Sequence, residues 1–120
     1  MRIRIMDCVY QYLLTNKDID DILEENLDMD DKESIPFIVE NTIGVINNLD
    51  ELQEEISPKL KDYKFDRLGY VEQSILLMSL YQMKYSDIDR PVIINEAIEI
   101  AKQFCDDDAP KFINGVLDQL

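Results

Sequence analysis

Residues 66–84 read DRLGYVEQSILLMSLYQMK, and this stretch decides the fold. Its apolar side chains recur every three or four residues, which is the spacing of one face of an α-helix. They cover more than half of the helix circumference, whereas a surface helix keeps a narrower apolar stripe. We therefore predict that this stretch is the central, most buried helix of a bundle, with these apolar residues: Leu68, Val71, Ile75, Leu76, Met78, Leu80, Tyr81 and Met83.

The chain before this stretch predicts four more helices. Residues 2–16 carry one apolar stripe, formed by Ile3, Met6, Val9, Tyr10, Leu13 and Leu14. Asp18 is a suitable N-cap for a second helix, and an acidic loop is predicted over residues 28–33. Ser34 starts a third helix, and the fourth should end or kink at Ser57-Pro58, because proline disfavours helical backbone before it.

The chain after residue 84 predicts two more helices. The sixth starts at Pro91, and the seventh is predicted to be capped by the acidic residues 106–108. The inward residues of the sixth are predicted to be Val92, Ile94, Ala97, Ile98, Ala101 and Phe104. No segment alternates with the period of two that a strand needs. We predict an all-α protein of about seven helices, with residues 1–120 as a single domain.

Composition excludes several classes of function. The sequence has no histidine, which removes Ser-His-Asp and Cys-His catalysis and histidine-ligated metals. It lacks a Gly-rich phosphate loop, and the acidic run from Asp18 to Asp31 has no glycine of the kind an EF-hand requires. A net charge of −14 repels nucleic acid at long range. We expect a protein that is not an enzyme and that carries no cofactor and no metal.

The cysteines and the first residues indicate the compartment. Cys8 and Cys105 lie in apolar helical patterns, where a thiol usually behaves as a small apolar group. Arg4 and Asp7 interrupt any apolar run of a signal peptide. The longest apolar stretch, residues 74–81, is too short to span a bilayer. A reduced cytoplasmic protein without membrane contact is therefore expected.

Three motifs in the second half resemble one known family. They read FDRLGYVEQSILL at 65–77, INEAIEIAKQF at 94–104 and DAPKFINGVLD at 108–118. In this order and spacing they resemble the NusB family of transcription antitermination factors. The first half matches more weakly, through Val9-Tyr10 and Gly44-Val45.

The resemblance implies a fold and a function. The fold is two small three-helix bundles packed together, with a seventh helix. The function is non-enzymatic: such proteins pair with the ribosomal protein NusE, bind the boxA element of nascent RNA, and join the RNA polymerase antitermination complex on ribosomal RNA operons. Homodimers also occur in this family, and the sequence leaves that question open.

The resemblance also implies site residues. It places an RNA surface at Tyr10, Phe104, Asp108, Lys111, Phe112 and Asn114. The family has an arginine-rich first segment, of which Arg2 and Arg4 remain, and an arginine in the central helix, where this chain has Leu77. Asp66, Arg67 and Glu72 are implied on the NusE side. With fewer cations, we expect weak binding of boxA RNA by the chain alone and much of the positive charge to come from NusE.

Several features have a second, structural interpretation. Phe104 and Phe112 follow the apolar spacing and are predicted as core on that basis, and close helix packing explains Gly115. Two interpretations stay open for the basic cluster, which consists of Lys59, Lys61, Lys64 and Arg67: a replacement RNA patch, or a solvated helix end. Two also stay open for the function, because a divergent acidic scaffold that has lost RNA contact needs no substitute cations near Arg2, Arg4 and Leu77.

Overall fold

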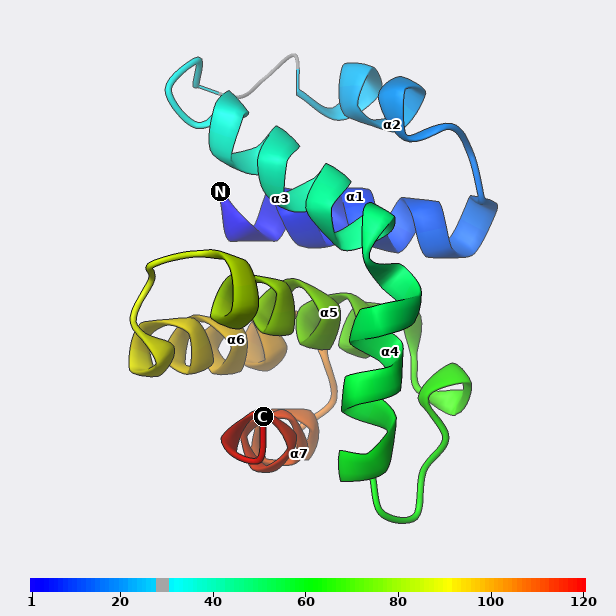
Figure 1. The fold of residues 1–120 in the computed structure, drawn as a ribbon, viewed down its shortest axis with the longest axis vertical. Coiled ribbons are helices and arrows are strands. Elements are labelled where there is room, and N and C mark those ends of the chain that lie inside the picture. The colour runs from blue at the N-terminus through cyan, green and yellow to red at the C-terminus, as the bar shows by residue number, and fades with distance from the viewer. Residues whose placement is uncertain (28–30) are drawn as a thin grey trace.

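Helix α5 (Tyr70–Tyr85) lies at the centre of the computed structural model, which describes residues 1–27 and 31–120 (Figure 1). Every residue from Gln73 to Gln82 is buried, as the wide apolar face predicts. The α-helix begins four residues later than predicted, because the chain before it forms a short 3-10 helix, η2 (Phe65–Arg67), followed by extended backbone at Leu68. Extended backbone cannot continue the hydrogen bonds of an α-helix.

Three helices from the first half pack together on one side of α5 (Figure 1). They are α1 (Arg2–Thr15), α2 (Ile19–Asn26) and α3 (Ile35–Asn47). Helix α1 contacts both of the others and α5. Its buried residues are Ile5, Met6, Cys8 and Val9.

The predicted start of α2 is confirmed. The carboxylate of Asp18 accepts a hydrogen bond of 2.8 Å from the backbone N–H of Asp20, which satisfies one of the unpaired donors at a helix start. Of the predicted acidic loop, residues 28–30 lie outside the described residues, and residues 32–34 form a turn.

Helix α4 (Leu49–Ile56) leads from this group to the opposite end of the molecule (Figure 1). It ends at Ile56, as the Ser57-Pro58 pair predicts, and continues as a 3-10 turn, η1 (Ser57–Lys59). The connector to α5 then reverses direction at Lys61, whose φ of 50° is left-handed. Lysine rarely adopts this conformation, whereas Asn16, with a φ of 55° at the end of α1, is a residue type that tolerates it.

The last two helices, α6 (Arg90–Phe104) and α7 (Ala109–Asp118), pack on each other and on α5. The inward face of α6 differs from the predicted one: Val92 and Phe104 are exposed, and the buried residues are Ile93, Ile94, Ala97, Ile100 and Ala101. The side chain of Asp108 makes no capping hydrogen bond. Asp108 of the acidic run therefore stands at the N-cap position of α7, as predicted, but its side chain does not cap the helix.

The C-terminal end of α7 is satisfied from α6 instead. The guanidinium of Arg90 donates hydrogen bonds to the carbonyl oxygens of Leu117 (2.8 Å), Asp118 (2.8 Å) and Leu120 (2.5 Å). A cation at a helix C-terminus also opposes the negative end of the helix dipole. The first residue of α6 therefore fixes the end of α7.

Helix α3 approaches α5 most closely at Gly44. A Cβ on Gly44 would lie 2.1 Å from Cζ of Tyr81, so only glycine fits without rearrangement. Around Gly115, by contrast, no atom lies within 4 Å of a built Cβ. The prediction that close packing explains Gly115 is therefore wrong, and the close approach occurs at Gly44.

The predicted all-α class is confirmed. Residues 1–27 and 31–120 contain seven α-helices and two 3-10 helices, and no strand. The group α1–α3 lies over α5, while α6 and α7 cover its other side (Figure 1). None of the helices in this described part combines the length and hydropathy of a membrane span.

Candidate RNA and partner interface

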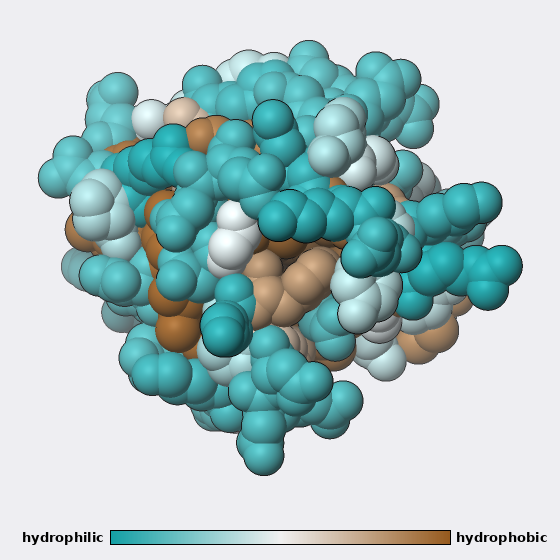
Figure 2. All heavy atoms as spheres, turned by 90° about the horizontal axis from the view of Figure 1, so that it is seen from below, coloured by the Kyte–Doolittle hydropathy of each residue, from teal (hydrophilic) through white to brown (hydrophobic). Residues whose placement is uncertain are grey.

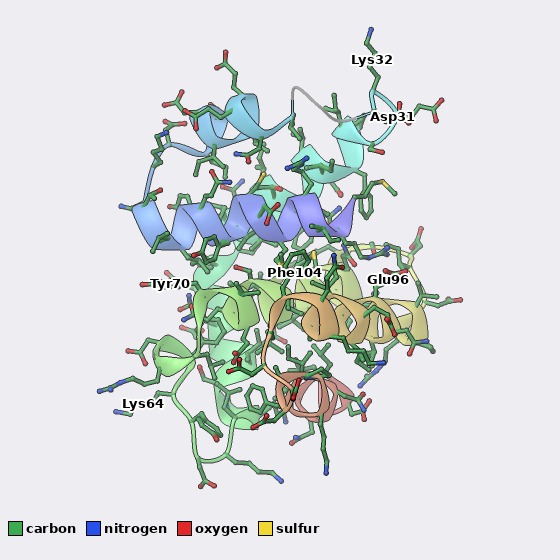
Figure 3. The ribbon with its side chains drawn as sticks, turned by 180° about the vertical axis from the view of Figure 1, so that it is seen from behind. Asp31, Lys32, Lys64, Tyr70, Glu96 and Phe104 are labelled. Carbon is green, nitrogen blue, oxygen red and sulfur yellow. The ribbon has the colours of Figure 1, made fainter. Side chains whose placement is uncertain are left out.

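Aromatic side chains from three helices reach the surface on one face of the molecule. Tyr10 of α1 packs edge-on against Tyr70 of α5, with ring centroids 6.4 Å apart. Phe104, the last residue of α6, is 43% exposed, so its predicted place in the core is wrong. Tyr70 and Phe104 are labelled on this face in Figure 3. Exposed rings provide the surfaces on which RNA bases stack.

The two N-terminal arginines have protein partners. The side chain of Arg2 donates a 3.3 Å hydrogen bond to the amide oxygen of Gln82, and its guanidinium lies 5.8 Å from the ring centre of Phe37. Arg2 therefore helps to hold α1, α3 and α5 together. Arg4 is 3.8 Å from the carboxylate of Asp7.

Position 77 supplies no cation to the surface. The side chain of Leu77 is fully buried in the main core cluster. Charge at this part of the surface would have to come from other elements or from a bound partner.

A second aromatic pair stands at the other end of the face. The rings of Tyr63, in the connector, and Phe112, in α7, meet edge-on with centroids 5.6 Å apart. Phe112 is half-buried against the core, while Tyr63 is 59% exposed. Lys111 beside them is exposed, and Asn114 is half-buried. We call this pair the Tyr63–Phe112 ridge.

An acidic groove of about 180 Å³ lies on one side of the ridge. Its charged residues are Glu72, Asp106 and Asp108. Burial, and then the charge of Asp106, raise the pKa of Glu72 above its ordinary value of 4.5. The folded chain therefore holds the proton of the Glu72 carboxyl group more tightly than the unfolded chain does. As the pH rises from the unfolded pKa through the higher folded pKa, the contribution of Glu72 to stability falls. A half-buried carboxyl group beside two further acidic side chains suits a cationic partner.

The thiol of Cys105 reports on the same charges. Burial, then Glu72 and Asp106, raise the pKa of Cys105 to about 11. At pH 8 we expect its thiolate fraction to lie about a hundredfold below that of an ordinary cysteine, so reaction with a thiol reagent will be slow. The pH dependence of the reaction rate measures this, and Glu72→Gln should lower the thiol pKa. A Cys105 thiol that titrates at its ordinary value of 9.0 would contradict the described electrostatics.

The remaining predicted residues fall into two groups. Asp66 and Arg67 are exposed on η2, near the start of α5 that carries Glu72. Arg2 lies elsewhere, since it lines a groove with Glu96 and Glu99 of α6. Sequence reasoning missed Tyr63 and Tyr70. Their only signal was a large aromatic residue outside the apolar stripe, which is more often neutral than functional.

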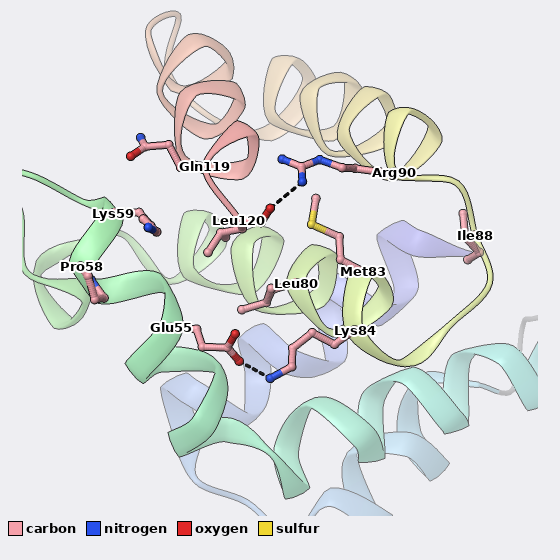
Figure 4. A pocket seen from close by; sticks show the side chains of 10 residues that line it. All are labelled: Glu55, Pro58, Lys59, Leu80, Met83, Lys84, Ile88, Arg90, Gln119 and Leu120. Carbon is pink, nitrogen blue, oxygen red and sulfur yellow. Dashed lines mark hydrogen bonds and ion pairs between the residues drawn. The ribbon is translucent and has the colours of Figure 1, made fainter.

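Another groove, of about 570 Å³, lies at the junction of α4, α5, α6 and the C-terminus (Figure 4). Three of its charged side chains have structural partners: Lys84 binds Glu51 (2.9 Å) and Glu55, and Arg90 binds the end of α7. The neighbouring carboxylates raise the pKa of Lys84, so it stays cationic. Among the described residues no acidic or cysteine cluster is suited to hold a metal.

Comparison with known proteins identifies similar sequences over the full length. The NusB family model matches residues 1–120. A Bacillus pumilus protein named transcription antitermination protein NusB is 41% identical over 120 residues, covering 99% of this chain and 90% of that protein. The protein of the same name from Wolinella succinogenes is 38% identical, covering 97% and 87%.

Solved structures agree with the fold. NusB of T. maritima superposes with a TM-score of 0.92 at 32% identity, over 98% of this chain and 85% of that one. A crystal structure of the antitermination factors NusB and NusE in complex with dsRNA superposes with a TM-score of 0.87 at 21% identity, over 98% and 90%.

Proposed function

Since the chain belongs to the NusB family, we propose that it acts as a transcription antitermination factor that pairs with NusE and binds boxA-type RNA in nascent ribosomal RNA transcripts. The observation that carries the proposal is the match of the family over residues 1–120. The superposed complex of NusB, NusE and dsRNA shows that this fold is compatible with both partners. The protein works in the cytoplasm, as part of the RNA polymerase antitermination complex, and as a single domain.

The face with the aromatic rings supports RNA as a ligand. Tyr10 and Phe104 present rings at the surface, and Phe112 stands beside the exposed amine of Lys111. We propose that these residues, with Arg4, Asp108 and Asn114, contact RNA. Arg2 contributes by fixing the start of α1, because its guanidinium is already held by Gln82 and Phe37.

The acidic groove supports a cationic protein partner. Glu72 lies in it with Asp106 and Asp108, and the exposed residues Asp66 and Arg67 lie on the adjoining η2. A basic ribosomal protein bound here would gain from charge complementarity, which directs association and orientation. We propose that NusE binds across this groove, and that the protein catalyses no reaction.

The alternative function is an acidic protein-binding scaffold without RNA contact. The burial of Leu77 and the structural contacts of Arg2 favour it, because both positions then supply no cation to RNA. The two functions differ in whether the complex with NusE binds RNA at all.

Titration of boxA RNA with and without NusE, at two salt concentrations, tests the proposal. We expect weak binding by the chain alone and tighter, salt-dependent binding with NusE. Arg4→Ala combined with Lys111→Ala should lower the salt slope by about 1.4, at about 0.7 for each phosphate contact on a single strand. Lys32→Ala, at an exposed position in the turn before α3 (Figure 3), is the control. Absence of RNA binding with NusE present would favour the scaffold, and an unchanged slope would refute the two residue assignments.

A further inference from the structure

A second groove lies on the other side of the Tyr63–Phe112 ridge, between the connector and α7. It measures about 240 Å³, and its charged residues are Lys59, Lys61 and Lys111 against one carboxylate, Asp62. In a chain with a net charge of −14, this is a local excess of positive charge. We call it the basic groove, in contrast to the acidic groove across the ridge. Seen from below, this end of the molecule is mostly hydrophilic, with apolar atoms in recesses between polar side chains (Figure 2).

The three lysines are available to a ligand. Within the described residues, none of them forms a side-chain hydrogen bond or an ion pair with the protein. The other lysines with a role in the fold behave differently: Lys84 binds Glu51 and Glu55, and Lys17 binds Glu25. Lysines that are close to one another without carboxylate partners repel, so an anionic ligand would relieve an unfavourable interaction.

The ridge supplies a ring at the edge of the basic groove. Tyr63 is 59% exposed, although its edge-on contact with Phe112 keeps it in place. A ring held by one neighbour but open to solvent is a surface on which a nucleic-acid base can stack. Phosphate-binding amines next to a stacking ring are the combination that proteins use to bind single strands.

Gly115 keeps the basic groove open. It lies inside α7 and lines the groove, although glycine inside a helix is less favourable than alanine. Packing does not explain it, because a Cβ would meet no atom within 4 Å. Lys61 is also held in left-handed backbone, which costs energy for a lysine. Both residues are unfavourable for the fold, and both line the same groove.

We propose that the basic groove is a subsite for single-stranded RNA, with phosphates against Lys59, Lys61 and Lys111 and one base on Tyr63. The subsite rests on the proposed function, since it takes RNA as the ligand. It supplies cations that positions 2 and 77 do not, and it assigns Lys59 and Lys61 of the basic cluster to RNA contact. Of the acidic groove on the far side of the ridge, Glu72 and Asp106 stay with the protein partner, while Asp108 is the residue proposed to contact RNA.

Two variants test the subsite with two RNAs. Lys59→Ala/Lys61→Ala removes two cations, and Lys17→Ala/Lys32→Ala is the matched control. Anisotropy titrations use boxA RNA with the NusE complex, and an oligouridine of equal length with the chain alone, across a series of salt concentrations. We expect the first double variant to lower the salt slope by about 1.4 with both RNAs, or about a tenfold loss of affinity at physiological salt. The control should retain both the slope and the affinity.

Gly115→Leu tests the open shape of the basic groove without changing its charge. A leucine fills the groove and improves helix propensity, so we expect a several-fold loss of RNA affinity without a lower unfolding temperature. Wild-type RNA affinity in both Gly115→Leu and Lys59→Ala/Lys61→Ala would overturn the subsite. It would also be overturned if polyglutamate displaced the bound RNA as well as oligouridine does.

The two RNA arms distinguish failure of the subsite from failure of the function. If both variants bind boxA RNA as tightly as the wild type does, the proposed function stands and the subsite is refuted. If oligouridine binds in a way that depends on the lysines but boxA RNA does not bind, the subsite stands and the proposed function is refuted. Binding of neither RNA would overturn both.

Discussion

Gly44→Ala is expected to lower the free energy of unfolding by about 3 kcal/mol, the upper end of the usual cost of overpacking a core. The new Cβ would lie 2.1–2.4 Å from three atoms of the Tyr81 ring. That ring cannot simply move aside, because it is 8% exposed and packs against Tyr85 at 5.1 Å between centroids. Denaturant unfolding followed by circular dichroism measures the loss.

Gly115→Ala is the matched control for this experiment. It makes the same change inside a helix, but in open space, and should stabilise the protein by about 0.5–1 kcal/mol. Adding Tyr81→Ala to Gly44→Ala should cost less than the sum of the single changes, because the cavity relieves the clash. Equal effects of alanine at positions 44 and 115 would contradict the described crossing of α3 and α5.

Glu72→Lys is expected to weaken association with NusE by at least tenfold. The variant puts a cation into the groove that Asp106 and Asp108 also line, and it removes a half-buried carboxyl group from the proposed partner surface. Truncating one member of a desolvated charge pair typically costs 2–5 kcal/mol, at about 1.4 kcal/mol for each factor of ten, so tenfold is a modest expectation. Calorimetric titration measures it.

Two further variants separate the interface from folding. Glu96→Lys makes the same charge change at an exposed site on α6 (Figure 3) and should leave NusE affinity unchanged. Glu72→Gln should weaken pairing without lowering the free energy of unfolding, because burial disfavours the charged form of the Glu72 carboxyl group. Glu72→Lys with wild-type affinity would remove Glu72 from the interface.

The fold could be predicted from the sequence where one helix face dominates. Apolar residues cover most of the circumference of α5, and this pattern predicts a fully buried helix. Asp18 predicts the start of α2, because its cap depends only on a local hydrogen bond. The face of α6 was ambiguous, because Val92, Ile93 and Ile94 are adjacent apolar residues and only packing against α5 and α7 decides which of them are buried.

The candidate site could be predicted only in part. Family motifs indicated Phe112 and Lys111, but not that Tyr63 pairs with Phe112, since the connector approaches α7 only in three dimensions. The spacing of apolar residues placed Phe104 in the core, whereas the last residue of a helix can extend past the core it covers. Likewise, no local signal distinguishes Gly44 from Gly115, because the difference lies in which helix crosses them.

The central claim is that this chain is an adaptor that binds a basic ribosomal protein rather than a catalyst. Titration of purified NusE into the wild-type chain tests it most directly. We predict a one-to-one complex whose affinity falls as salt rises, because an acidic groove meets a cationic surface. Absence of heat and of a co-eluting complex, even at low salt, would contradict the account.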